Sequence, residues 1–227
     1  MVKRMATARE QLLSMLAEKS FCLGEFKLSS GGISDYYIDC RLTTLDAAGA
    51  RLTGEAVFDE IRKRDWHANA IGGLTLGADP IVVATAIISA QRGKPLHGFL
   101  VRKAEKAHGT GQRIEGFRQK PARVVIVDDV CTTGASTIQA IEAAREFGFD
   151  VAGVLCLVER EEAGGRATVA KAAAPAEFVA MFTANDVRAE HVKYGPPPIF
   201  AVSAKCDFCD RPAVTNTPGN RCEVHRP

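Results

Sequence analysis

"RVVIVDDVCTTGAST", residues 123–137, is the segment that decides the fold class of this chain. An apolar run ends at two adjacent carboxylates, Asp128 and Asp129, and small and hydroxylated residues follow. The run predicts a buried parallel strand, and the next segment predicts a helix that ends at Gly148. Because open parallel sheets bind ligands at the carboxyl ends of their strands, we expect the two carboxylates to face a ligand.

Strand and helix patterns alternate on both sides of this segment. Residues 21–28 and 35–40 predict two short strands of a hairpin, after an amphipathic helix in the first twenty residues. The alternation predicts an α/β domain whose central parallel sheet is covered by helices on both faces. The other predicted strands are 69–73, 96–101, 150–160 and 177–184, and the other predicted helices are 52–61, one that begins near Pro80, and 185–193, with Thr183 and Asp186 spaced as a helix cap.

Composition narrows the class of protein. With 227 residues, 46% hydrophobic content and a net charge of +2, the chain suits one main domain and gives no general attraction to nucleic acid. The longest apolar run, "PIVVATAIISA", is shorter than the roughly 20 residues of a membrane helix. Seven cysteines, an odd number, argue against a secreted disulfide framework. We therefore expect a cytoplasmic protein without a membrane partner.

The composition changes near residue 195, so we predict a main domain at 1–195 and a tail at 196–227. The tail has the pattern C-x2-C, twelve residues, C-x2-H, which suits one tetrahedral structural Zn²⁺. Unligated thiols are the alternative, and nucleic-acid binding by this tail rests only on three arginines. The predicted zinc ligands are Cys206, Cys209, Cys222 and His225.

The segment after the carboxylates is suited to bind phosphate. Hydroxyls of Thr132, Thr133 and Ser136 and the N–H groups that open a helix can converge on an anion. Asp128 and Asp129 can accept hydrogen bonds from sugar hydroxyls or hold a bridging cation. Together they predict a ribose 5-phosphate ligand, and the two common glycine-rich nucleotide-binding patterns are absent from the sequence. An ordinary strand–turn–helix unit with acidic caps is the alternative.

Two further features carry positive charge. The segment 102–111, "RKAEKAHGTG", predicts a mobile cationic lid that stabilises a departing anion, with a solvated basic turn as the alternative. Arg160 follows a predicted strand and can pair with a ligand carboxylate, unless it forms an ion pair with Glu159, Glu161 or Glu162.

The 123–137 segment resembles the phosphoribosyl diphosphate (PRPP) binding motif of type I phosphoribosyltransferases. "GEFKLSSGGISDYYIDCR", "VRKAEKAHGTG" and "VERE" resemble, in order and spacing, orotate phosphoribosyltransferases, over about residues 6–190. The resemblance implies the type I fold with an N-terminal hood, a homodimer whose lid reaches into the neighbouring subunit's site, and Mg²⁺. It also implies transfer of the phosphoribosyl group from PRPP to orotate, giving orotidine 5′-monophosphate and diphosphate in pyrimidine biosynthesis.

The resemblance also assigns roles to residues. Thr132 and Arg160 match positions near orotate, and Lys106 and His108 match the main catalytic positions of the lid, beside Asp128 and Asp129. Transfer to another base, or a PRPP-fold regulator without turnover, remain the alternatives. The implied PRPP-binding residues are Arg102, Lys103, Lys106, His108, Asp128, Asp129, Val130, Cys131, Thr132, Thr133, Gly134, Ala135 and Ser136.

The chain departs from some family members at two positions. Ser29 and Leu76 stand where those members have lysines, so fewer cations are expected to face PRPP. Lys27 is a candidate substitute for one missing charge. The glycine-rich segment Gly73 to Gly77 can still offer backbone N–H groups to diphosphate.

Overall fold

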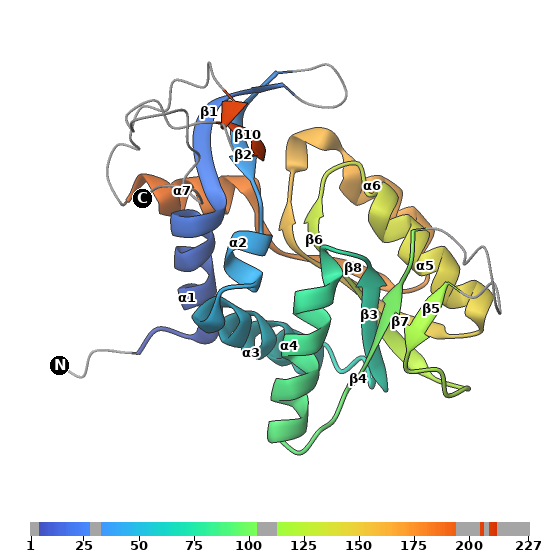
Figure 1. The fold of residues 1–227 in the computed structure, drawn as a ribbon. Helices are drawn as coiled ribbons and strands as arrows, with labels where there is room; N and C mark the ends of the chain where they lie inside the picture. Colours follow the sequence, from blue (N-terminus) through green and yellow to red (C-terminus); the bar gives the residue numbers. More distant parts are fainter. Residues whose placement is uncertain (1–4, 28–32, 104–112, 194–204, 207–208, 213–227) are drawn as a thin grey trace.

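A six-stranded sheet forms the centre of the structure, a computed structural model of the protein (Figure 1). The structure describes residues 5–27, 33–103, 113–193, 205–206 and 209–212. In spatial order the strands are β5 (Ile114–Gly116), β4 (His97–Val101), β3 (Ala70–Leu74), β6 (Arg123–Cys131), β7 (Asp150–Glu159) and β8 (Glu177–Thr183).

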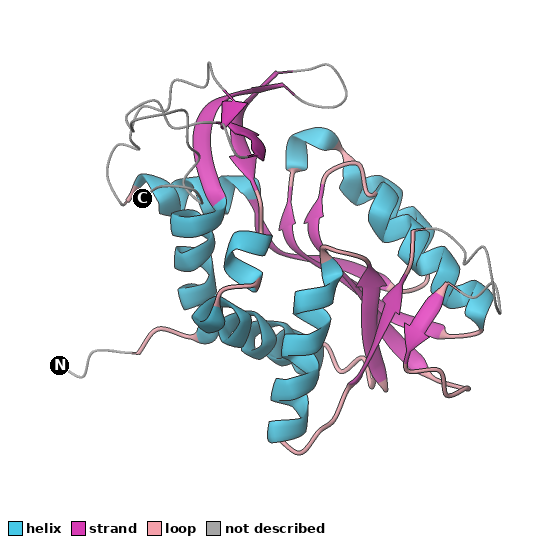
Figure 2. Cartoon of the chain, viewed as in Figure 1, coloured by secondary structure: helices cyan, strands magenta, loops and turns pink. Residues whose placement is uncertain are grey.

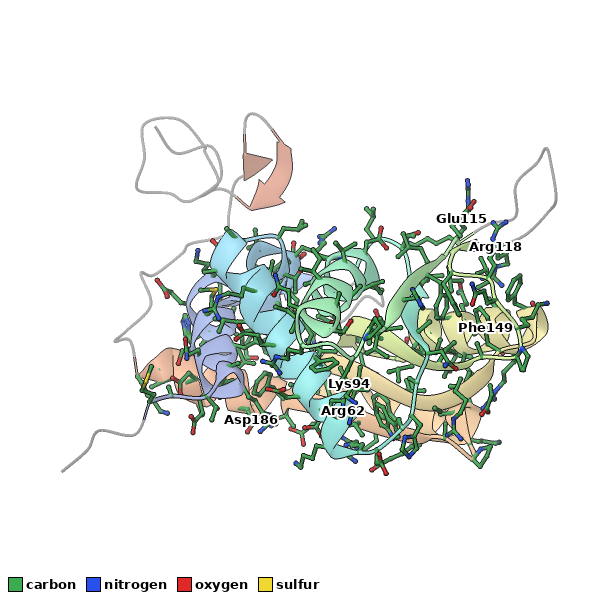
Figure 3. The ribbon with its side chains drawn as sticks, turned by 90° about the horizontal axis from the view of Figure 1, so that it is seen from below. Arg62, Lys94, Glu115, Arg118, Phe149 and Asp186 are labelled. Atoms are coloured by element: carbon green, nitrogen blue, oxygen red, sulfur yellow. The ribbon has the colours of Figure 1, made fainter. Side chains whose placement is uncertain are left out.

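Strand β6 lies inside the sheet, parallel to β3 on one side and to β7 on the other. The pairs β3–β4 and β7–β8 are also parallel, which confirms the predicted parallel sheet. Within this six-stranded sheet, only the edge strand β5, which was not predicted, runs antiparallel to its neighbour. Next to it, Arg118 Nη2 lies 3.1 Å from Glu115 Oε2 (Figure 3).

Helices cover both faces of the sheet, as predicted (Figure 2). Alternate residues of β6 serve the two apolar cores, because side chains alternate along a strand: Val125 and Val127 face one core, and Val124 and Ile126 face the other. The first core also takes residues from α1 (Ala8–Met15), α3 (Ala47–Lys63), α4 (Ala78–Gln91) and α7 (Ala184–Val192), and the second from α5 (Ala135–Phe147) and α6 (Gly165–Ala173).

A hairpin stands apart from the main sheet. Strands β1 (Phe21–Lys27) and β2 (Ile33–Ile38) pair antiparallel and form their own two-stranded sheet, which confirms the predicted hairpin. Burial alternates along β2, so Ser34 and Tyr36 are buried while Asp35 is exposed.

The helix ends follow the predicted signals in two places. Thr183 and Asp186 form the capping box of α7, and α5 ends at Gly148 with a left-handed backbone at φ 97°.

The remaining described elements are the π-helical turn η1 (Leu16–Ser20), α2 (Arg41–Thr44), the 3-10 turn η2 (Glu161–Ala163), β9 (Lys205–Cys206) and β10 (Cys209–Pro212). None of the helices in the described ranges combines the length and apolar character needed to cross a membrane.

Candidate active site

The loop after β6 leads directly into α5. Gly134 has a left-handed backbone at φ 84°, and a Cβ atom there would lie 2.3 Å from Val169 Cγ2, so glycine fits this turn where a side chain would not. Thr133 and Ser136 are exposed and Thr132 is half-buried. Hydroxyls and the N-terminal N–H groups of a 13-residue helix therefore lie together at the carboxyl edge of the sheet.

Asp128 is a buried carboxylate at the end of β6. It is 4% exposed, accepts a hydrogen bond from Thr137 Oγ1 at 2.7 Å, and accepts another from the Asp129 N–H at 3.0 Å. Burial raises the pKa of Asp128 to about 7, although the hydrogen bond from Thr137 opposes this. The carboxylate charge is therefore costly in the protein alone, and a ligand that donates hydrogen bonds would offset that cost.

The glycine-rich segment after β3 packs against Asp129. A Cβ atom on Gly77 would lie 2.3 Å from Asp129 Oδ1, and one on Gly73 would lie 2.0 Å from the Val127 carbonyl oxygen. The segments predicted to hold the two ends of PRPP are thus neighbours. Leu76, which lies between Gly73 and Gly77 in the chain, is 68% exposed.

The first turn of α6 supports the loop from the other side. A Cβ atom on Gly165 would lie 2.2 Å from the Thr132 carbonyl oxygen, so this helix begins in direct contact with the loop. Next to it, Arg166 Nε donates to Glu159 Oε1 at 2.9 Å. Glu159 is the last residue of β7 and is 2% exposed, and its carboxylate pairs with Arg166 and not with Arg160.

Arg160 lies beside the same loop. Its backbone N–H donates to the Cys131 carbonyl at 2.9 Å, and its side chain is only 11% exposed. Its Nε donates to Tyr36 Oη at 2.9 Å and to Glu162 Oε1 at 3.1 Å, and its Nη2 donates to Ser34 Oγ at 3.0 Å. Arg160 therefore forms the ion pair with Glu162 that was one alternative, and it does so in a buried position at the predicted binding edge.

The predicted lid is only partly described. Arg102 and Lys103 follow β4 and are exposed, and the Arg102 N–H donates to the Arg113 carbonyl at 2.9 Å. Lys106 and His108 lie outside the described residues. So do Ser29, Cys222 and His225, and the side chains of Lys27, Cys206 and Cys209.

The arrangement joins an anion site, a pair of carboxylates and a buried arginine at one edge of the sheet. Three contacts to this site were not predicted from sequence: those of Thr137, Tyr36 and Ser34. Within the described ranges, no group of three or more His, Cys, Asp and Glu side chains is placed to hold a metal ion. The site therefore suits two ligand groups: a phosphorylated sugar at the loop and the carboxylates, and a ligand carboxylate at the buried arginine.

Two of three comparisons with known proteins found similar chains. No family model matches the chain. The orotate phosphoribosyltransferase of Aquifex aeolicus is 41% identical to it over 170 residues, covering 74% of this chain and 91% of that protein. The solved orotate phosphoribosyltransferase of Mycobacterium tuberculosis is similar with a TM-score of 0.68 and 34% identity, covering 79% of this chain and 98% of its own. Its complex with PRPP is similar with a TM-score of 0.63 and 31% identity, at the same coverage.

Proposed function

The chain belongs to the orotate phosphoribosyltransferase family, and from this premise we propose that it transfers the 5-phosphoribosyl group of PRPP to orotate. The products are orotidine 5′-monophosphate and diphosphate. The observation that carries this proposal is the position of Arg160, which is buried beside the loop at 132–134 through the hydrogen bond of its N–H to Cys131. A carboxylate-binding group and a phosphate-binding loop thus share one edge of the sheet.

PRPP is proposed to bind along the ends of β6 and β3. Its 5-phosphate is bound by the N-terminal N–H groups of α5 and the hydroxyls of Thr132, Thr133 and Ser136. The ribose hydroxyls donate to Asp128 and Asp129, and the diphosphate lies over the segment Gly73 to Gly77. The contact between Gly77 and Asp129 supports this arrangement, because it places the two segments within the length of one ligand.

The transfer needs no nucleophile from the protein. Nitrogen N1 of orotate bonds to the anomeric carbon of the ribose as the bond from that carbon to diphosphate breaks, and the N1 proton passes to the diphosphate or to solvent. Positive charge develops on the sugar and negative charge on the leaving group. Lys106 and His108 are proposed to stabilise the leaving group from the lid. Asp128 and Asp129 fit Mg²⁺, which is commonly bound through one or two carboxylates and substrate phosphates, and when bound it would neutralise charge on the diphosphate.

Arg160 is proposed to select the base. Its guanidinium pairs with the carboxylate of orotate, with the Thr132 hydroxyl nearby. Uracil lacks this carboxylate and would leave the buried guanidinium without its ligand. A site built around such a group discriminates strongly against an analogue that lacks the partner.

The test is an incubation of the purified protein with Mg²⁺, PRPP and either orotate, uracil or adenine, with each base followed by its absorbance. We expect orotate alone to be consumed at a substantial rate. Arg160→Ala should raise the KM for orotate much more than the KM for PRPP. Arg92→Ala, at the far end of α4, is the control, because Arg92 pairs with Asp59 away from the site. Equal rates with orotate and uracil would show that the base assignment is wrong.

A homodimer is proposed from exposed apolar side chains on α4, just before α4 and at the C-terminal end of α2. Val83 and Ile87, four residues apart on α4, share one face and are 56% and 53% exposed. Leu76 and Leu45 are 68% and 70% exposed, and α2 packs against α4. Exposed apolar residues gathered in this way are typical of an interface between subunits.

Light scattering after size-exclusion chromatography measures the assembly. The double variant Val83→Glu/Ile87→Glu should be monomeric, whereas Val192→Glu should not change the mass, because Val192 is similarly exposed on α7. If the lid crosses between subunits, inactive Lys106→Ala and Asp129→Asn proteins should recover about a quarter of wild-type activity when mixed and reassembled. Verified heterodimers without activity would exclude shared sites.

The segment 196–227 is proposed to form a separate zinc-binding tail after a main domain at 1–195. The pairing of β9 with β10 supports this proposal, because it places Cys206 opposite Cys209, the two cysteines of the C-x2-C pattern. Cys222 and His225 would complete a closed tetrahedral site with a structural role.

A further inference from the structure

We propose that Tyr36 and Glu162 are positioning residues that hold one edge of the Arg160 guanidinium and leave its other edge for the carboxylate of the base. This inference rests on the proposed function. It extends the base site to a residue of the hairpin β1–β2 and to a residue of η2. Neither side chain need touch the substrate to affect its binding.

A guanidinium has two edges that each fit a carboxylate, one made by Nε and Nη2 and one by Nη1 and Nη2. In Arg160 the first edge is occupied, since Nε donates to Tyr36 Oη and Glu162 Oε1 and Nη2 donates to Ser34 Oγ. Among the residues that the structure describes, none accepts a hydrogen bond from Nη1. The second edge is therefore available to a ligand carboxylate.

Tyr36 is itself fixed in place. Its ring stacks on Phe21 with centroids 5.4 Å apart and an interplanar angle of 15°, and the Arg160 Cζ lies 4.5 Å from the ring centroid on which it packs. The Tyr36 hydroxyl accepts from Arg160 and donates to Glu162, so it links both partners. Burial and the hydrogen bond with Glu162 raise the pKa of Tyr36 to about 12, and the hydroxyl therefore stays protonated as a donor at neutral pH.

The side chain of Glu162 is 54% exposed, whereas its two partners, Arg160 and Tyr36, are buried. A simple surface ion pair would need only Glu162 and Arg160. Here the same carboxylate oxygen accepts from Tyr36, which is 7% exposed and comes from the hairpin, so the ion pair is tied to a buried group 126 residues away in sequence. The hydrogen bond between Tyr36 and Glu162 therefore fixes the orientation of the Arg160 guanidinium, whereas a simple ion pair would only balance its charge.

The experiment is steady-state kinetics on Tyr36→Phe, which removes the hydroxyl and keeps the ring. We expect the KM for orotate to rise about tenfold, as for the loss of one hydrogen bond to a charged group, while kcat and the KM for PRPP stay within about twofold. Tyr37→Phe is the matched control, because the neighbouring side chain points to the opposite face of β2 and is 45% exposed.

Glu162 provides a conservative pair of variants. Glu162→Ala removes the acceptor and should raise the KM for orotate, whereas Glu162→Gln keeps an oxygen that can accept from Tyr36 and Arg160 and should restore it to near the wild-type value. Glu161→Gln is the control in the same turn, because Glu161 accepts from Asn185 instead.

A double-mutant cycle shows whether Tyr36 acts through Arg160. In an Arg160→Ala background, Tyr36→Phe should have no further effect on the KM for orotate, because the group that it positions is gone. Additive effects, or an unchanged KM in Tyr36→Phe with active wild-type protein, would overturn the positioning role and leave the proposed function intact. A wild-type protein that does not consume orotate would overturn both.

Discussion

Replacing Asp128 by asparagine is expected to stabilise the protein while it removes its activity. The Asp128 carboxylate is 4% exposed, and its pKa lies at about 7 in the folded protein against an ordinary value of 3.8. Below pH 3.8 both the folded and the unfolded states hold the proton. Between pH 3.8 and 7 the folded state holds more protons than the unfolded state, so stability falls as pH rises through this window and then levels off.

The difference between a pKa of about 7 in the folded protein and 3.8 in the unfolded chain corresponds to a cost of about 4 kcal/mol at pH 8 and under about 2 kcal/mol at pH 5. Asparagine carries no charge but can accept only one of the two hydrogen bonds from Thr137 and the Asp129 N–H, which costs about 1–2 kcal/mol. The variant should therefore gain about 2–3 kcal/mol at pH 8, or about 5–10 °C in Tm, and almost nothing at pH 5.

The assay is thermal unfolding of both proteins from pH 5 to pH 8, without PRPP and with a chelator present. The difference between the two Tm values isolates Asp128, because every other titrating group is common to both. Asp150→Asn is the control, since Asp150 begins β7 at the opposite edge and its side chain is 67% exposed. A Tm difference that does not grow with pH, or an asparagine variant that is less stable at pH 8, would refute the reasoning.

Three other perturbations test the surroundings of the site. Gly77→Ala places a Cβ atom 2.3 Å from a carboxylate oxygen, so we expect the KM for PRPP to rise at least about tenfold. Gly93→Ala is the kinetic control: its added atom meets open space, and its left-handed backbone at φ 66° should make alanine lower the stability of the protein without changing the KM for PRPP. Arg166→Ala leaves a buried carboxylate unpaired, and because the arginine is 53% exposed the free energy of unfolding should fall by only about 1–2 kcal/mol, measured by urea denaturation. Elemental analysis of protein purified without added metal should give one zinc per chain, and none in Cys206→Ser/Cys209→Ser; a wild-type value near zero would remove zinc from this protein.

The central strand and its loop could be predicted from sequence because their signals are local. A continuous apolar run, the adjacent Asp128 and Asp129 and a helix that ends at Gly148 lie within 26 residues of one another, so pattern and turn chemistry suffice. Helix α6 was not predicted. Its sequence, "GRATVAKAA", buries only Gly165, Val169 and Ala173, which is too weak an apolar stripe to stand out from a loop.

The surroundings of Arg160 could not be predicted, for a different reason. The sequence suggested only acidic residues near it in the chain as partners, and Glu162 is one of them. Tyr36 and Ser34 approach from the hairpin, 124 and 126 residues away, and this contact depends on how the hairpin docks on the sheet. Thr137 had a weaker signal, since it stands in the first turn of α5, where a hydroxyl can reach back to the preceding strand.

The separation of the hairpin β1–β2 from the main sheet has a consequence for local unfolding. A two-stranded hairpin is marginally stable by itself, so the hairpin keeps its structure through contacts such as those of Tyr36 with Phe21 and Arg160. Its backbone amides should therefore exchange with deuterium earlier than those of β6, which opens only with the whole sheet. A ligand that fixes Arg160 also fixes the surface on which the hairpin docks. Occupation of the base site should then slow amide exchange throughout the hairpin, including residues that the ligand never contacts.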